Sequence, residues 1–181
     1  MRIVGGEFRG RRLVAPKGDI ARPTTDRLRE RLFNILEHSG HCELDGSRVA
    51  DVFAGTGALG LEALSRGAAI AVFVEKHHAS TKALRENIAA LGVDGRSVVL
   101  SADARSLPRQ DAFDIIFMDP PYGKGLAAPV LEGFRKSGWI VGGTLVVLET
   151  GKGEALIAEG YEEVDERTQG DSRLLFLKAV G

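Results

Sequence analysis

The chain has 181 residues, of which 44% are apolar and 27% are charged, and its net charge is −1. This size and composition predict one folded domain and exclude a disordered chain. No apolar run approaches the roughly 18–20 residues that cross a bilayer, and residues 1–18 lack the apolar core of a signal peptide, so we expect a cytoplasmic protein. The single cysteine, Cys42, excludes a disulfide framework and a zinc site of paired cysteines.

Positive charge gathers at the amino-terminal end. Residues 1–31 carry nine Lys or Arg against four Asp or Glu, so the rest of the chain is acidic. Guanidinium groups bind phosphate through two parallel hydrogen bonds, which makes nucleic acid a candidate partner. A solvated basic surface without a ligand stays equally open at this point. The candidate RNA-binding residues are Arg2, Arg9, Arg11, Arg12, Arg22 and Arg27.

The first elements in chain order are a small appendage and a helix. Residues 1–16 alternate weakly and contain three glycines, so we predict a β-hairpin appendage over residues 1–21 and a main domain over residues 22–181. The segment from Arg22 to Asp26 predicts a helix start with a threonine cap. The apolar stripe of this helix is Leu28, Leu32, Ile35 and Leu36, and its opposite face is expected to hold Arg27, Arg29, Arg31 and Asn34.

After a loop, short apolar runs alternate with helical patterns. The predicted strands are Arg48–Phe53, Ile70–Glu75, Ser97–Ser101, Phe113–Met118, Thr144–Glu149, Tyr161–Arg167 and Arg173–Ala179, and the predicted helices between them are Ala58–Arg66, Ala79–Leu91, Leu126–Lys136 and Gly153–Glu159. Alternation of this kind requires parallel strands with right-handed crossovers. The last two strands are separated only by residues 168–172, so they should form a hairpin, one strand of which runs antiparallel. The expected fold is therefore α/β and Rossmann-like, with a seven-stranded, mostly parallel sheet.

A glycine loop follows the first core strand and opens a helix. Gly55, Gly57 and Gly60 have the G-x-G-x-x-G spacing, which lets the backbone turn sharply and approach a ligand. Glu75 ends the next strand, where an acid can accept hydrogen bonds from the hydroxyls of an adenosine ribose. The loop and the acid together predict a nucleoside-containing cofactor. The candidate residues in the loop are Asp51, Phe53, Ala54, Gly55, Thr56, Gly57 and Gly60.

Two more acids bear on which cofactor binds. Asp51 would repel the pyrophosphate of a dinucleotide but suits the amino group and sulfonium of S-adenosylmethionine; alternatively it caps the amides of the loop. Asp103 lies just past the third core strand, where it can accept the exocyclic amine of adenine, and a helix N-cap is the other interpretation. These acids favour S-adenosylmethionine. The histidines show no metal-ligand spacing, so no metal is expected.

The fourth core strand runs into Asp119, Pro120, Pro121 and Tyr122, which we predict to be catalytic. Ligands of open α/β sheets bind outside the carboxyl ends of strands, where this segment lies. Two prolines make the backbone rigid and leave carbonyl groups as acceptors. The Asp119 carboxylate and the Pro120 carbonyl would each accept one N–H of an exocyclic amine, and Tyr122 would stack on the base. A rigid turn with an exposed aromatic ring is the alternative.

The chain as a whole resembles the RsmD family of bacterial 16S ribosomal RNA guanine-N2 methyltransferases. The resemblance rests on residues 1–11, on residues 22–27 with 32–36, on residues 51–63 and on residues 119–122. It implies a class I S-adenosylmethionine-dependent methyltransferase whose sheet ends in an antiparallel hairpin. It also implies that the substrate is one guanine, position 966 in the customary numbering of that RNA, on a small-subunit particle. We expect the enzyme to be a monomer.

Two alternatives remain. One is an adenine-N6 methyltransferase that acts on DNA or RNA, because such enzymes share the Asp-Pro-Pro-Tyr motif. Sequence-specific DNA enzymes usually carry a separate recognition domain, for which this chain is short. The other alternative is a non-catalytic RNA-binding protein on a methyltransferase fold, against which the intact motif at residues 119–122 speaks.

Overall fold

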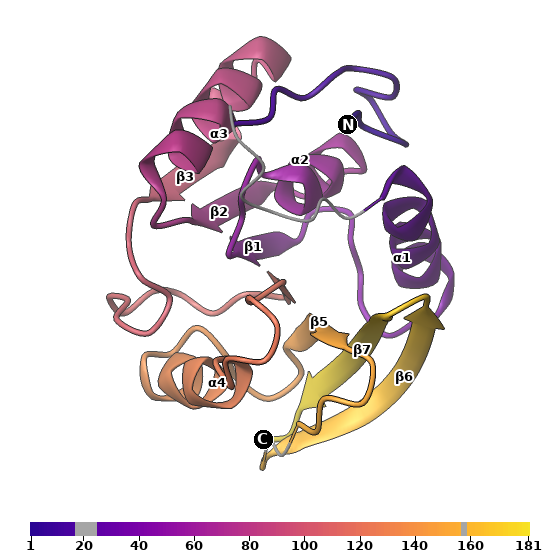
Figure 1. Ribbon diagram of the computed structural model, residues 1–181, viewed down its shortest axis with the longest axis vertical. Helices are drawn as coiled ribbons and strands as arrows, with labels where there is room; N and C mark the ends of the chain where they lie inside the picture. The colour runs from indigo at the N-terminus through magenta and orange to yellow at the C-terminus, as the bar shows by residue number, and fades with distance from the viewer. Residues whose placement is uncertain (17–24, 157–158) are drawn as a thin grey trace.

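The computed structural model describes residues 1–16, 25–156 and 159–181. Twelve elements lie along the chain (Figure 1). The helices are α1 (Asp26–His38), α2 (Ala58–Ser65), α3 (His78–Leu91), the 3-10 turn η1 (Asp94–Arg96) and α4 (Ala127–Lys136); the strands are β1 (Arg48–Val52), β2 (Ile70–Val74), β3 (Ser97–Leu100), β4 (Ile115–Met118), β5 (Leu145–Gly151), β6 (Tyr161–Gln169) and β7 (Ser172–Ala179). Within the described ranges, no helix has the length and apolarity needed to cross a membrane.

The strands form one seven-stranded sheet in the order β3-β2-β1-β4-β5-β7-β6. The first five strands of this order pair in parallel, and β7 pairs antiparallel with both β5 and β6. The prediction of a mostly parallel sheet that ends in an antiparallel hairpin is therefore confirmed. Because the parallel strands share a direction, their carboxyl ends meet at one edge of the sheet.

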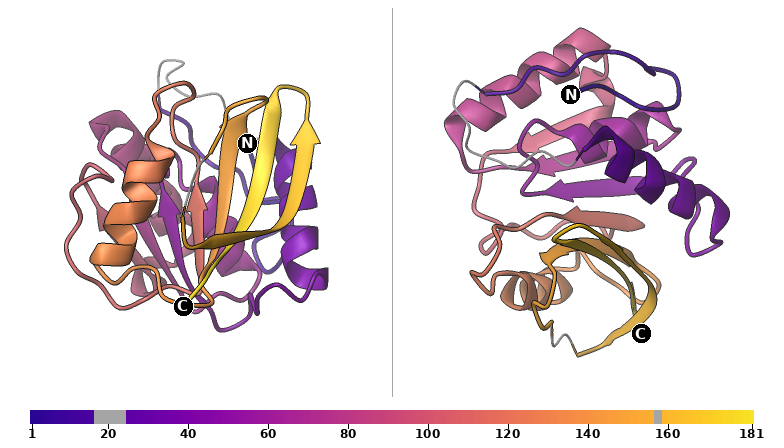
Figure 2. Two further views of the ribbon diagram at one scale, coloured as in Figure 1. Left: turned by 90° about the horizontal axis from the view of Figure 1, so that it is seen from below. Right: turned by 45° about the vertical axis from the view of Figure 1, so that its right-hand side comes forward.

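Helices cover both faces of the sheet, and the central strands β1, β2, β4 and β5 are buried on both sides for this reason. In β4, Ile115 and Phe117 join the core under α1, α2 and α3, whereas Ile116 and Met118 join the core under α4. Figure 2 shows α1 and α4 on opposite sides of the sheet. Successive side chains of a strand point to opposite faces, so a continuous apolar run fills two cores.

Local sequence signals explain most of the element boundaries. The Oγ1 of Thr25 accepts the backbone N–H of Leu28 and caps α1, as predicted. β1 is one residue shorter than expected, because Phe53 adopts a left-handed φ of 63°. The predicted helix Gly153–Glu159 is wrong over its described part, which forms a turn and irregular backbone. Gly153 has a φ of 87°, which an α-helix does not contain, and β5 instead continues to Gly151.

The amino-terminal segment packs on α2 and α3. Arg2 and Arg12 form an antiparallel bridge, and the Ile3 N–H donates to the Arg11 carbonyl, so the strands of the expected hairpin meet at one bridge only. The tip of this hairpin lies away from the carboxyl ends of the parallel strands. There the Glu7 N–H donates to the carbonyl of Ser65, the last residue of α2, at the opposite edge of the sheet. The division between residues 1–21 and 22–181 falls outside the described residues and stays a prediction.

A buried ionic network fixes this segment. Arg29, expected on the solvent face of α1, is wholly buried, because its guanidinium reaches the Arg2 carbonyl at 2.7 Å and lies 3.7 Å from Glu62. The carboxylate of Glu62, also fully buried, accepts the backbone N–H groups of Val4 and Gly5 at 2.9 and 2.8 Å, and the Nε of Arg66 at 2.9 Å. The carboxylate therefore satisfies two backbone donors and balances two buried guanidinium groups.

Glu62→Ala should destabilise the protein by about 3–5 kcal/mol, because it removes the acceptor of two backbone N–H groups and of the Arg66 Nε, together with the buried charge that balances Arg29. Urea denaturation measures this change. Glu37→Ala is the matched control: Glu37 also binds Arg66, at 3.0 Å, but its side chain is 35% exposed, so the loss should stay below about 1 kcal/mol. Equal losses for the two variants would contradict a structural role of the buried network.

Candidate active site

The glycine loop packs tightly between β1 and α2. The Asp51 carboxylate accepts the backbone N–H of Gly60 at 2.8 Å, so it caps an amide of the loop. Gly57 has a φ of 81° at the start of α2. A Cβ on Gly60 would lie only 2.4 Å from the ring of Phe73. The loop thus has the backbone conformation and the close helix-to-sheet packing that its spacing predicted.

Glu75 lies directly after β2 and is 7% exposed. One of its carboxylate oxygens accepts the Gly55 N–H at 2.9 Å, and the other accepts the His77 N–H at 2.8 Å. An ionised carboxylate offers about four acceptor positions, so two remain for a ligand. Glu75 thereby connects the glycine loop to the start of α3 and keeps its capacity to bind hydroxyl groups.

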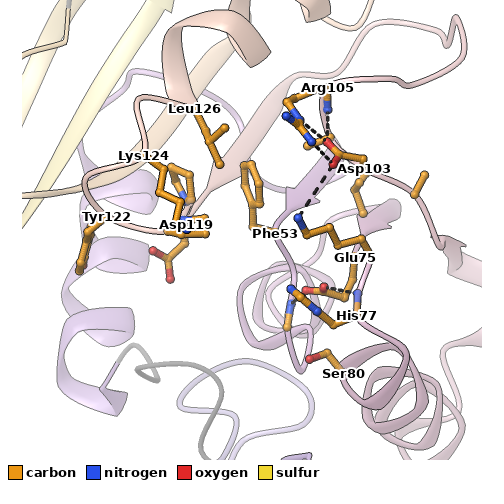
Figure 3. A pocket seen from close by; sticks show the side chains of 17 residues that line it. Phe53, Glu75, His77, Ser80, Asp103, Arg105, Asp119, Tyr122, Lys124 and Leu126 are labelled. Atoms are coloured by element: carbon orange, nitrogen blue, oxygen red, sulfur yellow. Dashed lines mark hydrogen bonds and ion pairs between the residues drawn. The ribbon is translucent and has the colours of Figure 1, made fainter.

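A cavity of about 520 Å³ opens at the carboxyl edge of the sheet. Figure 3 shows Asp119 and Tyr122 at one end of this pocket, Glu75 and Asp103 at the other, and Phe53 between them. The predicted site residues that line it are Phe53, Gly55, Glu75, Asp103, Asp119, Pro120, Pro121 and Tyr122. The predicted residues that do not line it are Asp51, Ala54, Thr56, Gly57 and Gly60.

Asp119 presents a carboxyl group to the pocket that makes no hydrogen bond with the described part of the chain. Burial, and then the neighbouring charges of Glu149 and Asp51, raise the pKa of Asp119 to about 8. Burial likewise raises the pKa of Asp51 to about 7, with the Gly60 amide acting in the opposite direction and Glu75 adding to the rise. A positively charged ligand in this pocket would favour the ionised carboxylates.

Asp103 lines the other end of the pocket, but Arg105 already occupies its carboxylate. The backbone N–H, Nε and Nη2 of Arg105 donate to it at 2.9, 2.9 and 2.8 Å, and these bonds hold the pKa of Asp103 well below its usual range. The ammonium of Lys76 lies 3.9 Å away. Adenine binding by Asp103 therefore stays a prediction.

Tyr122 is bound by two residues that the sequence did not single out. Its hydroxyl donates to Glu149 of β5 at 2.7 Å and lies 3.1 Å from the hydroxyl of Ser172 of β7. Other lining residues that sequence reasoning missed are Lys76, His77, Ser80, Arg105, Lys124 and Leu126. Several of them come just after a strand end, which is the signal that could have found them.

The candidate RNA-binding arginines are separated by the fold. Arg2, Arg9 and Arg27 line one hollow of about 380 Å³ between the amino-terminal segment and α1. The guanidinium of Arg11 donates to the Ala90 carbonyl at 2.5 Å near the end of α3. Arg12 is exposed beside its bridge to Arg2, and Arg22 lies outside the described residues.

Metal ligands do not gather in this protein as far as the structure describes it. No group of three or more His, Cys, Asp or Glu side chains in the described ranges could hold a metal ion. In and around the pocket, Glu75 and Asp51 instead accept backbone amides, Asp103 binds Arg105, and Glu149 accepts the hydroxyl of Tyr122.

The comparisons with known proteins find relatives over most of the chain. "Ribosomal RNA small subunit methyltransferase D" of Escherichia coli strain K12 is 40% identical over 83% of this chain and 74% of its own length. The Haemophilus influenzae protein of that name is 35% identical over 94% of this chain and 89% of its own. The solved structure of yhhF from Escherichia coli has a TM-score of 0.85 at 34% identity and covers 99% of this chain and 98% of its own.

Residues 1–178 match the family model described as conserved hypothetical protein 95. The sheet order, with its antiparallel carboxyl-terminal hairpin, is that of class I methyltransferases. The chain therefore belongs to the RsmD family.

Proposed function

We propose that this protein transfers a methyl group from S-adenosylmethionine to the exocyclic N2 of a guanine in 16S ribosomal RNA, position 966 in the customary numbering. The observation that carries the proposal is Asp119, a partly buried residue whose carboxyl group lines the pocket and makes no hydrogen bond with the described residues. A carboxylate in this position can accept the N–H groups of an exocyclic amine. The names of the relatives in Escherichia coli and Haemophilus influenzae support ribosomal RNA as the substrate.

The end of the pocket at Glu75 fits the cofactor. A volume of about 520 Å³ suits a small molecule, and the lining combines apolar side chains such as Phe53 with carboxylates. Glu75 would accept the ribose hydroxyls through its two remaining acceptor positions. When bound, S-adenosylmethionine supplies a methyl group on a positively charged sulfonium. The carboxyl groups of Asp51 and Asp119, when ionised, attract such a cation and would repel the pyrophosphate of a dinucleotide.

The end of the pocket at Asp119 fits the target amine. The Asp119 carboxylate and the Pro120 carbonyl each accept one N–H of the guanine amine, which directs the nitrogen lone pair away from the ring. Pro120 and Pro121 lack N–H groups, so the backbone here offers acceptors only. The nitrogen loses a proton readily once it carries the methyl group, so catalysis rests mainly on positioning.

The second part of the proposal concerns how the protein binds its RNA substrate. Exposed guanidinium groups around the hollow between the amino-terminal segment and α1 would bind phosphates next to a flipped-out guanine, since the amine is inaccessible in a stacked base. We propose that the protein acts as a cytoplasmic, metal-independent monomer on a small-subunit particle.

Transfer of a labelled methyl group tests the proposed function directly. The protein is incubated separately with 16S RNA, small subunits and DNA, and the product is digested to nucleosides. Label in N2-methylguanosine is the expected result. Label in N6-methyladenine would instead support the adenine alternative, and cofactor binding without transfer to any of these substrates would contradict the proposal.

Glu75→Ala should weaken binding of S-adenosylmethionine by about 100-fold or more, because two hydrogen bonds to a charged acceptor are lost at roughly 1.5–3 kcal/mol each. Isothermal titration calorimetry measures the dissociation constant. Glu86→Ala, which removes an exposed acid of α3, is the control and should bind like wild type. An unchanged dissociation constant in folded Glu75→Ala would refute the assigned role.

Asp119→Ala should reduce methyl transfer at saturating cofactor by at least about 100-fold while the cofactor affinity stays within a few-fold of wild type, since Asp119 is assigned to the target amine. Single-turnover kinetics and calorimetry measure the two quantities. Asp111→Ala, at an exposed position before β4, is the control. A near wild-type transfer rate for Asp119→Ala is the outcome that would disprove the assignment.

Replacing Arg9 and Arg27 by Ala together should weaken RNA binding and reduce the slope of log affinity against log salt by about 2, because each phosphate contact releases counterions. Filter binding across a salt series measures the slope, and the cofactor affinity should not change. The matched control replaces Arg109 and Lys136, two exposed cations beside α4 on the other face of the sheet. A wild-type slope for the variant that lacks Arg9 and Arg27 would show that the RNA binds another surface of the protein.

A further inference from the structure

Tyr122 is anchored at one end and open at the other. Its hydroxyl lies between Glu149 and Ser172, at 2.7 and 3.1 Å, and both partners are buried, with exposed fractions of 7% and 8%. Tyr122 itself is 38% exposed. The phenol is therefore held by its polar end while part of the ring stays accessible from the pocket (Figure 3).

The hydrogen bonds that hold the Tyr122 hydroxyl, which we call the hydroxyl anchor, connect three segments that are distant in sequence. Tyr122 belongs to the loop after β4, Glu149 to β5 and Ser172 to β7. Ser172 pairs with Gly151 in the antiparallel register of β5 and β7, and a Cβ on Gly151 would lie 4.0 Å from the Cδ1 of Tyr122. The ring edge thus lies against the backbone of β5, next to the carboxylate that accepts its hydroxyl.

The loop that carries Tyr122 does not fix the ring by itself. Gly123 and Gly125 follow it with φ values of 70° and 60°, and the loop residues from Pro121 to Gly125 are exposed. A stacking surface binds a base more strongly when its side chain is already ordered, because the entropy of ordering is not lost on binding. The hydroxyl anchor provides this order.

The hydrogen bond to Glu149 also affects the ring face. A phenol that donates to a carboxylate forms a strong, charge-assisted bond and gains electron density. The faces of aromatic rings attract cations, and an amine that has just received a methyl group carries positive charge. An anchored Tyr122 would therefore interact more favourably with the methylated base than with the substrate base.

We propose that Glu149 and Ser172 are positioning residues, which hold the ring of Tyr122 as a preformed stacking surface for the target base and act through its hydroxyl. This inference rests on the proposed function, because it assigns the Asp119 end of the pocket to the base. It adds two residues, from β5 and β7, to the site.

A double-mutant cycle tests whether Glu149 acts through the tyrosine. Tyr122→Phe keeps the ring and removes the hydroxyl, and Glu149→Gln keeps the size of the acceptor and removes its charge. Each variant should lower kcat/KM for the RNA substrate by about tenfold, as expected for one hydrogen bond to a charged group. The double variant should be no worse than Tyr122→Phe alone.

The cycle separates this role from an effect of Glu149 on Asp119. If Glu149→Gln lowers or raises the rate equally in the wild-type and Tyr122→Phe backgrounds, Glu149 acts independently of the hydroxyl and the proposal is overturned. Ser172→Ala should cause a smaller loss, which also disappears in the Tyr122→Phe background. The affinity for S-adenosylmethionine should be unchanged in all these variants, and Tyr161→Phe, a substitution on β6, is the matched control with wild-type activity.

A titration tests the anchor without any activity measurement. The chain has two tyrosines, so in Tyr161→Phe the absorbance change of phenol ionisation reports Tyr122 alone. Burial and the neighbouring carboxylate raise the pKa of Tyr122, and adding Glu149→Gln should lower the midpoint. Circular dichroism at each pH confirms that the protein stays folded. An unchanged midpoint would show that Glu149 does not hold the Tyr122 hydroxyl and would overturn the inference. Failure of the wild type to methylate RNA would overturn the proposed function instead, and the titration would still test the hydrogen bond.

Discussion

Parallel pairing of β2, β1, β4 and β5 aligns four strand ends, each of which carries an acid. Asp51 lies in β1, Glu75 and Asp119 follow β2 and β4, and Glu149 lies near the end of β5. The register of these strands places the acids at one edge, although almost a hundred residues separate the first from the last. Helices on both faces exclude water from the strands below this edge, so the carboxylates gather where their charges are poorly solvated.

Three of these four carboxylates have donors within the protein. Gly60 donates to Asp51, Gly55 and His77 donate to Glu75, and Tyr122 donates to Glu149. Asp119 differs, because its side chain makes no hydrogen bond to the described residues and its pKa rises to about 8. The two ends of the pocket therefore differ: Glu75 is held by two backbone amides and keeps two acceptor positions for a ligand, whereas all acceptor positions of Asp119 are open to one.

The amino-terminal segment is part of the same architecture. Glu62 holds Val4 and Gly5 through their backbone N–H groups. On α3, Asn87 binds both backbone groups of Val14 and donates to the carbonyl of Thr56 in the glycine loop. The segment therefore reaches the glycine loop through Asn87 at Val14, whereas its tip lies against the end of α2. The basic charge of the amino-terminal segment did not predict which part of it lies near the glycine loop and which part near α2. Charge in a sequence does not specify the surface on which a segment packs.

The sequence by itself determined the fold class, the antiparallel hairpin at the end of the sheet and the positions of the glycine loop, Glu75 and Asp119 at strand ends. These rest on local signals: continuous apolar runs predict strands covered on both faces, and motifs at strand ends predict ligand contacts. Tertiary structure alone decided that Arg29 is buried against Glu62 and that Tyr122 is held by Glu149 and Ser172. Each of these last facts depends on which side chains meet across elements. The pattern of residues within one helix or strand predicts its buried face. It does not identify the side chain of another element that will contact it.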